Sequence, residues 1–384
     1  MKFPDYSHAN LNLVHSLLKY YGVESNRKGL KEIDVLLCTR KYKKIVLLVM
    51  DGLGYHNLKN YNSNSFLASK DKGPISTIYP STTAAVMTMY ESGLPVFESG
   101  WVSWSTYFKS LNRSIDLFTG KDSLTQEAVS YPYRDLIKYE SIYKKIRNKN
   151  PNLDIYQLYP EKINKDAEPC VQLKYQTIVD LVDKLNELCS DNNEKFIFAY
   201  CNEPDASMHT LGPDAKEIHL IMDEFDDLMK VFYNNLDNET LVIVTADHGQ
   251  IEITKTYYFN EYQDLMDMLV MPPLLEGRVR SFFVKSEYRD VFEEKFKNYF
   301  ADDFILCTKD DVYICDLFGD GKEHELFKDS IGDYIAIAVK NAVIDYISPF
   351  LGDDGFVFKG HHAGLCKEEM EVPLIILKKD EEND

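Results

Sequence analysis

Residues 45–54 read IVLLVMDGLG, in which six consecutive apolar residues are followed by Asp51 and then by Gly52-Leu53-Gly54. A continuous apolar run of this length is typical of a strand that is buried on both faces of a parallel sheet. Asp51 would then lie where the strand leaves the sheet, and the glycines allow a sharp turn there. Open α/β sheets bind ligands outside the carboxyl ends of their strands. Asp51 is therefore a candidate functional carboxylate, and the N-cap of the next helix is the alternative.

Four other apolar runs predict further strands of the same sheet. They are residues 74–80, 196–200, 241–245 and 372–377. Apolar residues at helical spacing predict amphipathic helices at 172–190 and 215–235, and residues 121–170 are expected to form polar helical pieces and loops. Strands that alternate with helices in this way indicate an α/β fold.

The charge balance, 43 Lys and Arg against 62 Asp and Glu, gives a net charge of −19. Such a surface repels DNA and RNA, so a nucleic-acid polymer is not expected as a partner. A small phosphate ester remains compatible where a local positive charge, such as a metal ion, receives it.

The seven cysteines are widely spaced, odd in number and without a CxxC pair, which indicates a reducing compartment. The N-terminal residues lack the apolar core of a signal peptide, and no apolar run is long enough to span a bilayer. We therefore expect a cytoplasmic protein that does not associate with membranes.

Hydroxyl residues mark a predicted helix start after the second strand. Ser81, Thr82 and Thr83 stand directly before an Ala-rich apolar segment. The strand would deliver both threonines to a helix N-terminus, where free N–H groups and the helix dipole favour anions. The alternative is that one of the threonines is only an N-cap.

Four of the nine histidines lie just after apolar strands, and two of these have an aspartate at metal-ligand spacing. The residues are Asp205, His209, Asp247, His248, His361 and His362, and Asp51 follows another such strand. Imidazole nitrogen and carboxylate oxygen are zinc ligands, and a catalytic zinc ion typically has three protein ligands and one open position. Two such sites roughly 3.5–4 Å apart would clamp the attacking and leaving oxygens of a phosphoryl transfer.

Two segments depart from this pattern of strands and helices. Residues 92–118 are rich in aromatic side chains, including Trp101 and Trp104, and are expected either to pack in the core or to form a wall of a substrate pocket. Residues 255–330 are predicted to form a small α/β insertion, similar to a cap. The main domain would then consist of residues 1–254 and 331–384.

The motifs MDGLGY, YPSTTAA, SGLPVFESGW, NEPDASMHTLGP, TADHG and GHHAGL, followed by VPLIIL, occur in this order. Together they resemble the alkaline phosphatase superfamily, most closely its nucleotide pyrophosphatase/phosphodiesterase branch and the bacterial relatives of that branch. The resemblance covers roughly residues 44–250 and 330–377. It implies a doubly wound, mostly parallel sheet with helices on both faces, two zinc ions (with manganese as the alternative) and a covalent phosphothreonine intermediate.

Carried over by motif, the resemblance implies two sets of metal ligands. One ion would be held by Asp205, His209 and His362, and the other by Asp51, Asp247 and His248. The last threonine of P-x-x-T is Thr83, which the resemblance implies to be the nucleophile; its hydroxyl needs metal coordination to react. His362 is preferred over His361 because it stands directly before two small residues, which leaves His361 behind the ligands or facing the pocket.

The resemblance is incomplete on the substrate side. Trp104 falls near the position at which eukaryotic diesterases of this branch have an Asn that donates to the phosphoryl group, and residues 255–330 do not match the branch in detail. Arg278 and Arg280 could reach an anionic substrate, although surface positions are the favoured interpretation. The candidate substrate contacts are Trp104, His361 and Arg280.

The leading hypothesis is a two-metal phosphoester hydrolase of the phosphodiesterase or nucleotide pyrophosphatase type, acting on a small phosphoester such as a nucleotide. A phosphomonoesterase and a phosphonate (C–P) hydrolase are the enzymatic alternatives, because one scaffold can carry all three activities. The non-enzymatic alternative is a protein in which metal ions only stabilise the fold. A threonine at an anion-favouring helix start, Thr83, has no role in that alternative.

Overall fold

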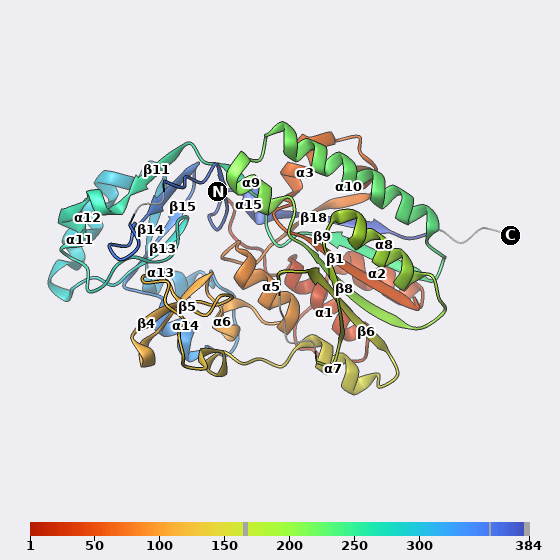
Figure 1. Cartoon of the computed structure of the whole chain (residues 1–384). Coiled ribbons are helices and arrows are strands. Elements are labelled where there is room, and N and C mark those ends of the chain that lie inside the picture. Colours follow the sequence, from red (N-terminus) through yellow and green to blue (C-terminus); the bar gives the residue numbers. More distant parts are fainter. Residues whose placement is uncertain (164–167, 353–354, 380–384) are drawn as a thin grey trace.

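The computed structural model describes residues 1–163, 168–352 and 355–379, and its largest element is a seven-stranded sheet (Figure 1). In spatial order its strands are β2 (Asp71–Ser76), β18 (Glu371–Leu377), β9 (Thr240–Thr245), β1 (Lys44–Met50), β8 (Lys195–Cys201), β6 (Asp154–Pro160) and β7 (Val171–Tyr175). Only β18 runs against its neighbours in this sheet. The expected α/β class with a mostly parallel sheet is confirmed.

Strand β1 occupies the centre of the sheet, between β8 and β9. Every residue of these three strands is buried, as expected for apolar strands covered on both faces. The parallel register places Met50 beside Cys201 and Val49 beside Thr245. The segments that follow the three strands therefore emerge next to one another at one edge of the sheet.

Helices cover both faces of the sheet, which confirms the doubly wound arrangement (Figure 1). The helices of one face are α1 (Asn10–Tyr20), α5 (Thr83–Ser92) and α7 (Ile142–Lys149), and α2 (Lys31–Thr39) packs against α1. The helices of the other face are α3 (Tyr55–Asn62), α4 (Phe66–Lys70), α8 (Ile178–Cys189) and α10 (Lys216–Asn235). Helix α10 buries one apolar stripe, from Ile218 to Phe232, at helical spacing.

Two expectations for the outer strands of the sheet are wrong. Residues 171–175 form β7 instead of the start of a helix, and α8 begins only at Ile178, where the Thr177 hydroxyl accepts a hydrogen bond from the Asp180 N–H. Residues 154–160, expected as helix or loop, form β6. The buried residues of β6 include the polar Gln157, which breaks the apolar pattern expected of a strand.

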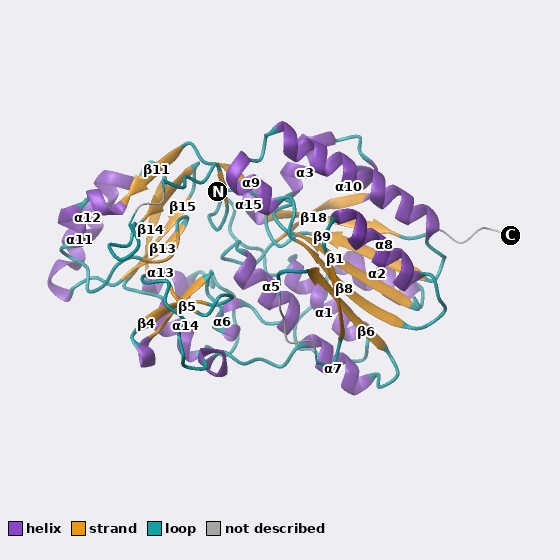
Figure 2. Ribbon diagram, in the orientation of Figure 1, coloured by secondary structure: helices purple, strands orange, loops and turns teal. Residues whose placement is uncertain are grey.

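A second, antiparallel sheet lies beside the main one (Figure 2). Its strands, in order, are β12 (Leu274–Glu276), β13 (Val279–Phe282), β15 (Tyr334–Ala338) and β14 (Phe304–Thr308). Helix α12 (Arg289–Phe300) covers this sheet with Phe292, Phe296 and Phe300, all fully buried. A parallel pair, β11 (Lys255–Tyr258) and β16 (Ala342–Asp345), completes this part of the molecule.

The strand pairing of this second sheet extends past the expected insertion boundary. β15 follows residue 330 yet lies between β13 and β14, and β16 pairs with β11. We therefore propose that the insertion extends over residues 255–345, because these strands make their backbone hydrogen bonds within it.

A third, smaller sheet arises from the segment that contains both tryptophans. Its strands are β3 (Ser105–Phe108), β4 (Arg113–Asp116) and β5 (Lys121–Asp122). Trp101 is buried in the aromatic cluster beneath it, together with Phe108 and Tyr133, whereas Trp104 is 41% exposed. Trp101 therefore packs in the core, as one of the two expectations for residues 92–118 states. Trp104 is exposed, as the other expectation, a wall of a pocket, requires.

The remaining elements are short. They are the helices α6 (Val96–Ser99), α9 (Asp205–Leu211), α11 (Gln263–Met266), α13 (Lys309–Ile314), α14 (Glu325–Ser330) and α15 (Lys367–Met370), four 3-10 turns, and the strand pair β10 (Ile251–Glu252) and β17 (Gly360–His361). All seven cysteines are free thiols. Across the described ranges, no helix combines the length and the apolar character needed to cross a bilayer.

A buried ion pair joins the second sheet to the main domain. Arg278 lies beside β13, and its Nε and Nη2 donate to the two carboxylate oxygens of Glu369, each at 2.7 Å. Both side chains are completely buried. Glu369 in α15 also accepts hydrogen bonds from the backbone N–H groups of Gly364 and Cys366. One carboxylate therefore fixes both the insertion and the loop that follows His362.

We expect Glu369→Gln to lower the free energy of unfolding by about 3 kcal/mol or more, because removing one partner leaves a buried charge uncompensated. Urea denaturation measures this change. The matched control is Glu293→Gln in the exposed Glu293–Lys297 pair, where we expect a loss of at most about 0.5 kcal/mol. Equal, small effects of the two substitutions would contradict the structural role of the buried pair.

Candidate active site

Three central strands deliver acidic residues to one edge of the sheet. Asp51 follows β1, Asp247 follows β9 after one residue, and Asp205 opens α9 shortly after β8. The turn after β1 depends on Gly52, which has a φ of +72°. A Cβ at Gly52 would lie 2.8 Å from the Cβ of Asp205, so only glycine lets the two acidic segments approach this closely.

The set Asp51, Asp247 and His248 forms one compact cluster, with ligand atoms within 4.8 Å of one another. His248 Nε2 lies 3.4 Å from an oxygen of each carboxylate. All three side chains are buried. The sequence-predicted ligand set at this position is thus brought together by the fold.

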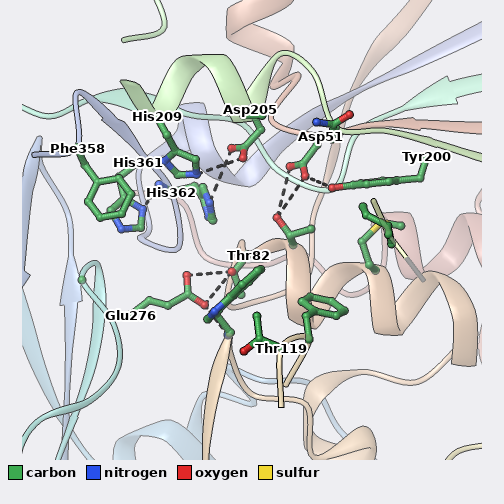
Figure 3. Close-up of a pocket in the computed structure, with 18 of the residues that line it drawn as sticks. Asp51, Thr82, Thr119, Tyr200, Asp205, His209, Glu276, Phe358, His361 and His362 are labelled. Carbon is green, nitrogen blue, oxygen red and sulfur yellow. Dashed lines mark hydrogen bonds and ion pairs between the residues drawn. The ribbon is translucent and has the colours of Figure 1, made fainter. Parts of the chain in front are cut away.

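The set Asp205, His209 and His362 is brought together through Asp205 (Figure 3). The Asp205 carboxylate lies 3.1 Å from His209 Nε2, at the i and i+4 positions of α9 that the sequence spacing predicts, and 3.8 Å from His362 Nε2. The rings of His248 and His362 stack with centroids 3.8 Å apart. The two clusters are therefore adjacent.

Three of the histidines are oriented by the same type of hydrogen bond, from Nδ1 to a backbone carbonyl. The Nδ1 atoms of His209, His248 and His362 lie 2.9, 3.1 and 3.0 Å from backbone carbonyl oxygens of Gly360, Gly249 and Ser81, respectively. A carbonyl oxygen can only accept, so each Nδ1 carries the proton. Each Nε2 is then left with a lone pair directed at the acidic cluster, which is the orientation that metal-bound histidines show.

His361 is oriented differently from the other three. Its Nδ1 accepts a hydrogen bond of 2.8 Å from the backbone N–H of His362. Burial, followed by the neighbouring charges, holds the pKa of His361 well below its usual range, so the ring is neutral and its proton is on Nε2. His361 also lies in a group of possible ligand atoms with His209 and His362, all within 4.8 Å of one another, so its sequence-based placement outside the ligand sets stays a prediction.

The buried carboxylates of this cluster are suited to binding a cation. Oδ2 of Asp247 is buried and has no hydrogen-bond partner among the described residues. Burial raises the pKa of Asp51 well above its usual value, and the charges of Asp247 and Asp205 raise it further. Burial likewise raises the pKa of Asp247. Buried carboxylates that face imidazole lone pairs are poorly matched to one another and well matched to divalent metal ions.

Thr83 lies beside the first cluster, at the N-terminus of α5. Its Oγ1 is 3.2 Å from His248 Nε2 and 3.4 Å from both carboxylate oxygens of Asp51. Thr82 occupies the N-cap position by its backbone, but its hydroxyl makes no capping hydrogen bond and donates to Glu276 instead. The two threonines therefore have different environments, and only Thr83 faces the acidic cluster.

A cavity of about 740 Å³ opens onto Thr83 and both clusters. Its lining includes all three sequence-predicted substrate contacts, Trp104, His361 and Arg280. Its described lining also includes aromatic side chains such as Phe118 and Phe358. Trp104 and Phe118 meet edge to face, with ring centroids 5.3 Å apart. Phe358 instead packs against His209, with ring centroids 5.2 Å apart, so aromatic side chains line the cavity both near Trp104 and beside the acidic cluster.

The favoured interpretation of Arg278 and Arg280 as surface residues is wrong. Arg278 is fully buried in its pair with Glu369. Arg280 is 9% exposed and donates to the backbone carbonyls of Leu275 and Ile344, so it lines the cavity while holding its own wall together. Sequence spacing could not show this, because Glu369 and Ile344 come from distant segments of the chain.

The sequence also did not single out two residues of the site. Tyr200, at the end of β8, donates its phenol to Oδ2 of Asp51. Glu276 of β12 accepts the Thr82 hydroxyl inside the cavity. The position of Tyr200 at a strand end is a weak signal that was available, whereas nothing in the residues around Glu276 points to the site.

Comparisons with solved structures agree on the fold. The murine and human ectonucleotide pyrophosphatase/phosphodiesterase 5 superpose with TM-scores of 0.63 and 0.64, at 18% and 17% identity, covering 86% and 87% of this chain and 87% and 88% of theirs. Phosphonoacetate hydrolase from Sinorhizobium meliloti, in complex with phosphonoformate, superposes with a TM-score of 0.63 at 13% identity, covering 88% of this chain and 91% of that one.

Sequence comparison identifies the family. An ectonucleotide pyrophosphatase/phosphodiesterase of Caenorhabditis elegans is 29% identical over 113 residues, which span 28% of this chain and only 13% of that relative. The family model for type I phosphodiesterase/nucleotide pyrophosphatase matches residues 45–344, most of the chain. The resemblance seen in the ordered motifs is thereby confirmed, and the chain belongs to the type I phosphodiesterase/nucleotide pyrophosphatase family of the alkaline phosphatase superfamily.

Proposed function

We propose that this protein is a two-metal phosphoester hydrolase of the phosphodiesterase or nucleotide pyrophosphatase type that forms a covalent phosphothreonine intermediate. The observation that carries the proposal is the position of the Thr83 hydroxyl. It lies 3.2 Å from His248 Nε2 and 3.4 Å from the Asp51 carboxylate, at the start of a helix and at the floor of the cavity.

The described donors suit two divalent ions, zinc or manganese. One would be held by Asp205, His209 and His362, and the other by Asp51, Asp247, His248 and the Thr83 oxygen. When bound, such ions supply positive charge that lowers the pKa of the Thr83 hydroxyl and neutralises the phosphoryl oxygens.

Residues of the chain position the substrate, and one of them forms a covalent bond to phosphorus. The Thr83 oxygen attacks phosphorus and forms an O–P bond as its hydroxyl proton is lost, and the leaving group departs with the electrons of its own O–P bond and takes up a proton. The first N–H groups of α5 point at the site and favour the anionic phosphoryl oxygens. Water then cleaves the bond between phosphorus and Thr83, which restores the hydroxyl. Trp104, His361 and Arg280 contact the rest of the substrate.

The comparisons support this assignment at the level of the family and its chemistry. A second structure of the murine relative is an inactive threonine-to-alanine variant in complex with AMP, with 17% identity, a TM-score of 0.63 and 87% coverage of each chain. This relative favours a catalytic threonine and a nucleotide substrate. The acidic surface and the free thiols remain compatible with a small substrate in a reducing, cytoplasmic setting.

We expect Thr83→Ala to lower kcat for bis(para-nitrophenyl) phosphate by about 10³-fold or more, because the attacking oxygen is lost. The variant should retain its bound metal, since six other donors remain. Steady-state kinetics and metal analysis of the same sample measure both quantities. Thr39→Ala, an exposed position on α2, is the control and should leave both unchanged. Full turnover by a metal-loaded Thr83→Ala variant would exclude Thr83 as the nucleophile.

We expect the zinc-loaded wild type to contain two ions per chain and to melt at a higher temperature than the metal-stripped protein, because the ions bind only the folded state. Asp247→Asn should reduce the content to about one ion, since it removes a ligand from only one of the two proposed sites. Plasma mass spectrometry and thermal denaturation provide the measurements. Asp290→Asn, exposed on α12, is the control. Retention of two ions by Asp247→Asn would refute the ligand assignment.

A further inference from the structure

Glu276 is a carboxylate of the substrate cavity that belongs to neither proposed metal site. Glu276 lines the cavity from β12, and its oxygens accept hydrogen bonds from the hydroxyls of Thr82 and Ser103, at 2.9 and 2.6 Å, and from the backbone N–H of Trp104, at 2.7 Å. Figure 3 shows the Glu276 carboxylate directed at Thr82, on the side of the cavity opposite the Asp205 and His209 pair.

The partners of Glu276 hold its carboxylate in place. Thr82 and Ser103 are buried, with exposures of 1% and 0%, and the three hydrogen-bonding partners of Glu276 are all donors. Glu276 has no ion-pair partner within the described residues. Arg280, a cation of the cavity wall, donates to backbone carbonyls and lies 3.6 Å from Asp345.

The position of this charge matters because Thr82 directly precedes Thr83. The N-terminus of α5 favours one anion through its N–H groups and dipole, and Glu276 is already held on the N-cap residue of that helix. A phosphoryl group bound at Thr83 therefore meets a fixed negative charge nearby. A group with one negative charge faces one repulsive interaction, and a group with two negative charges faces twice that repulsion.

We propose that Glu276 is a specificity-determining residue that selects singly charged phosphoryl groups, such as phosphodiesters, and disfavours doubly charged phosphomonoesters. This inference rests on the proposed function, since it assumes that the phosphoryl group binds at Thr83, and it names the substrate class of that site. At an effective dielectric constant of about 20, one unit charge within roughly 10 Å changes relative affinity for a second charge by about tenfold.

The test uses two substrates that differ in charge but share a leaving group. At pH 8, para-nitrophenyl phosphate carries two negative charges and para-nitrophenyl methylphosphonate carries one, because a methyl group replaces one oxygen. The ratio of their kcat/KM values is measured for the zinc-loaded wild type and for Glu276→Gln, which keeps the shape of the side chain and removes its charge. We expect Glu276→Gln to shift this ratio toward the doubly charged substrate by about tenfold.

Two further variants separate charge from structure. Glu276→Asp keeps the negative charge and should keep a ratio closer to that of the wild type than to that of Glu276→Gln. Glu287→Gln removes one negative charge from an exposed site of the same insertion and should leave the ratio unchanged. A ratio for Glu276→Gln that stays within about twofold of the wild type, well short of the tenfold electrostatic effect, would overturn the inference.

A binding measurement does not require turnover. Calorimetry on zinc-loaded Thr83→Ala, with and without Glu276→Gln, compares phenyl phosphate with phenyl methylphosphonate. Loss of the Glu276 charge should tighten binding of phenyl phosphate by about tenfold relative to phenyl methylphosphonate. If the wild type turns over neither substrate but this binding shift appears, the proposed hydrolysis fails and the role of Glu276 stands. If turnover is normal and neither ratio shifts, only the role of Glu276 fails.

Discussion

The rest of the structure depends on one electrostatic constraint, which is that Asp51, Asp205 and Asp247 are gathered in a buried region at one edge of the sheet. Burial and the neighbouring carboxylates raise the pKa of Asp51, and burial raises the pKa of Asp247. Such a cluster is stable when cations neutralise it or when protons do. The unpartnered Oδ2 of Asp247 and the imidazole lone pairs that face the carboxylates favour cations.

A layer of neutral and paired groups holds these charges in position. Gly52 lets the turn after β1 approach Asp205, and backbone carbonyls fix the rings of His209 and His362. Gln250 donates to Asp205 and is itself held by two hydrogen bonds with Asn57. The Arg278–Glu369 pair extends this layer into the insertion, so the position of the cavity wall and the geometry of the loop after His362 are linked.

The two sides of the cavity have different structural origins. The acidic side is built from segments that follow strands of the main sheet, which is the usual place for chemistry in an α/β fold. The opposite side comes from the small sheet that begins near Trp104 and from β12 of the insertion, and the two meet where Glu276 accepts the Trp104 N–H. The proposed hydrolysis takes place on the acidic side, and the proposed selectivity of Glu276 belongs to the opposite side, so the two proposals concern different parts of the cavity.

The sequence alone determined the main sheet and the residues at its edge, because these signals are local. A long apolar strand followed at once by Asp51, or by Asp247 and His248, can be read from neighbouring residues, and parallel strands present their carboxyl ends at one edge. It failed for β6, where the polar Gln157 occupies a buried position, and for β7, a five-residue strand that is mostly half-buried or exposed and lies directly before helix α8. Only the tertiary structure decided the roles of Glu276, Arg278 and Arg280. Their partners lie up to 194 residues away along the chain, and no local pattern encodes a hydrogen bond or an ion pair across that separation.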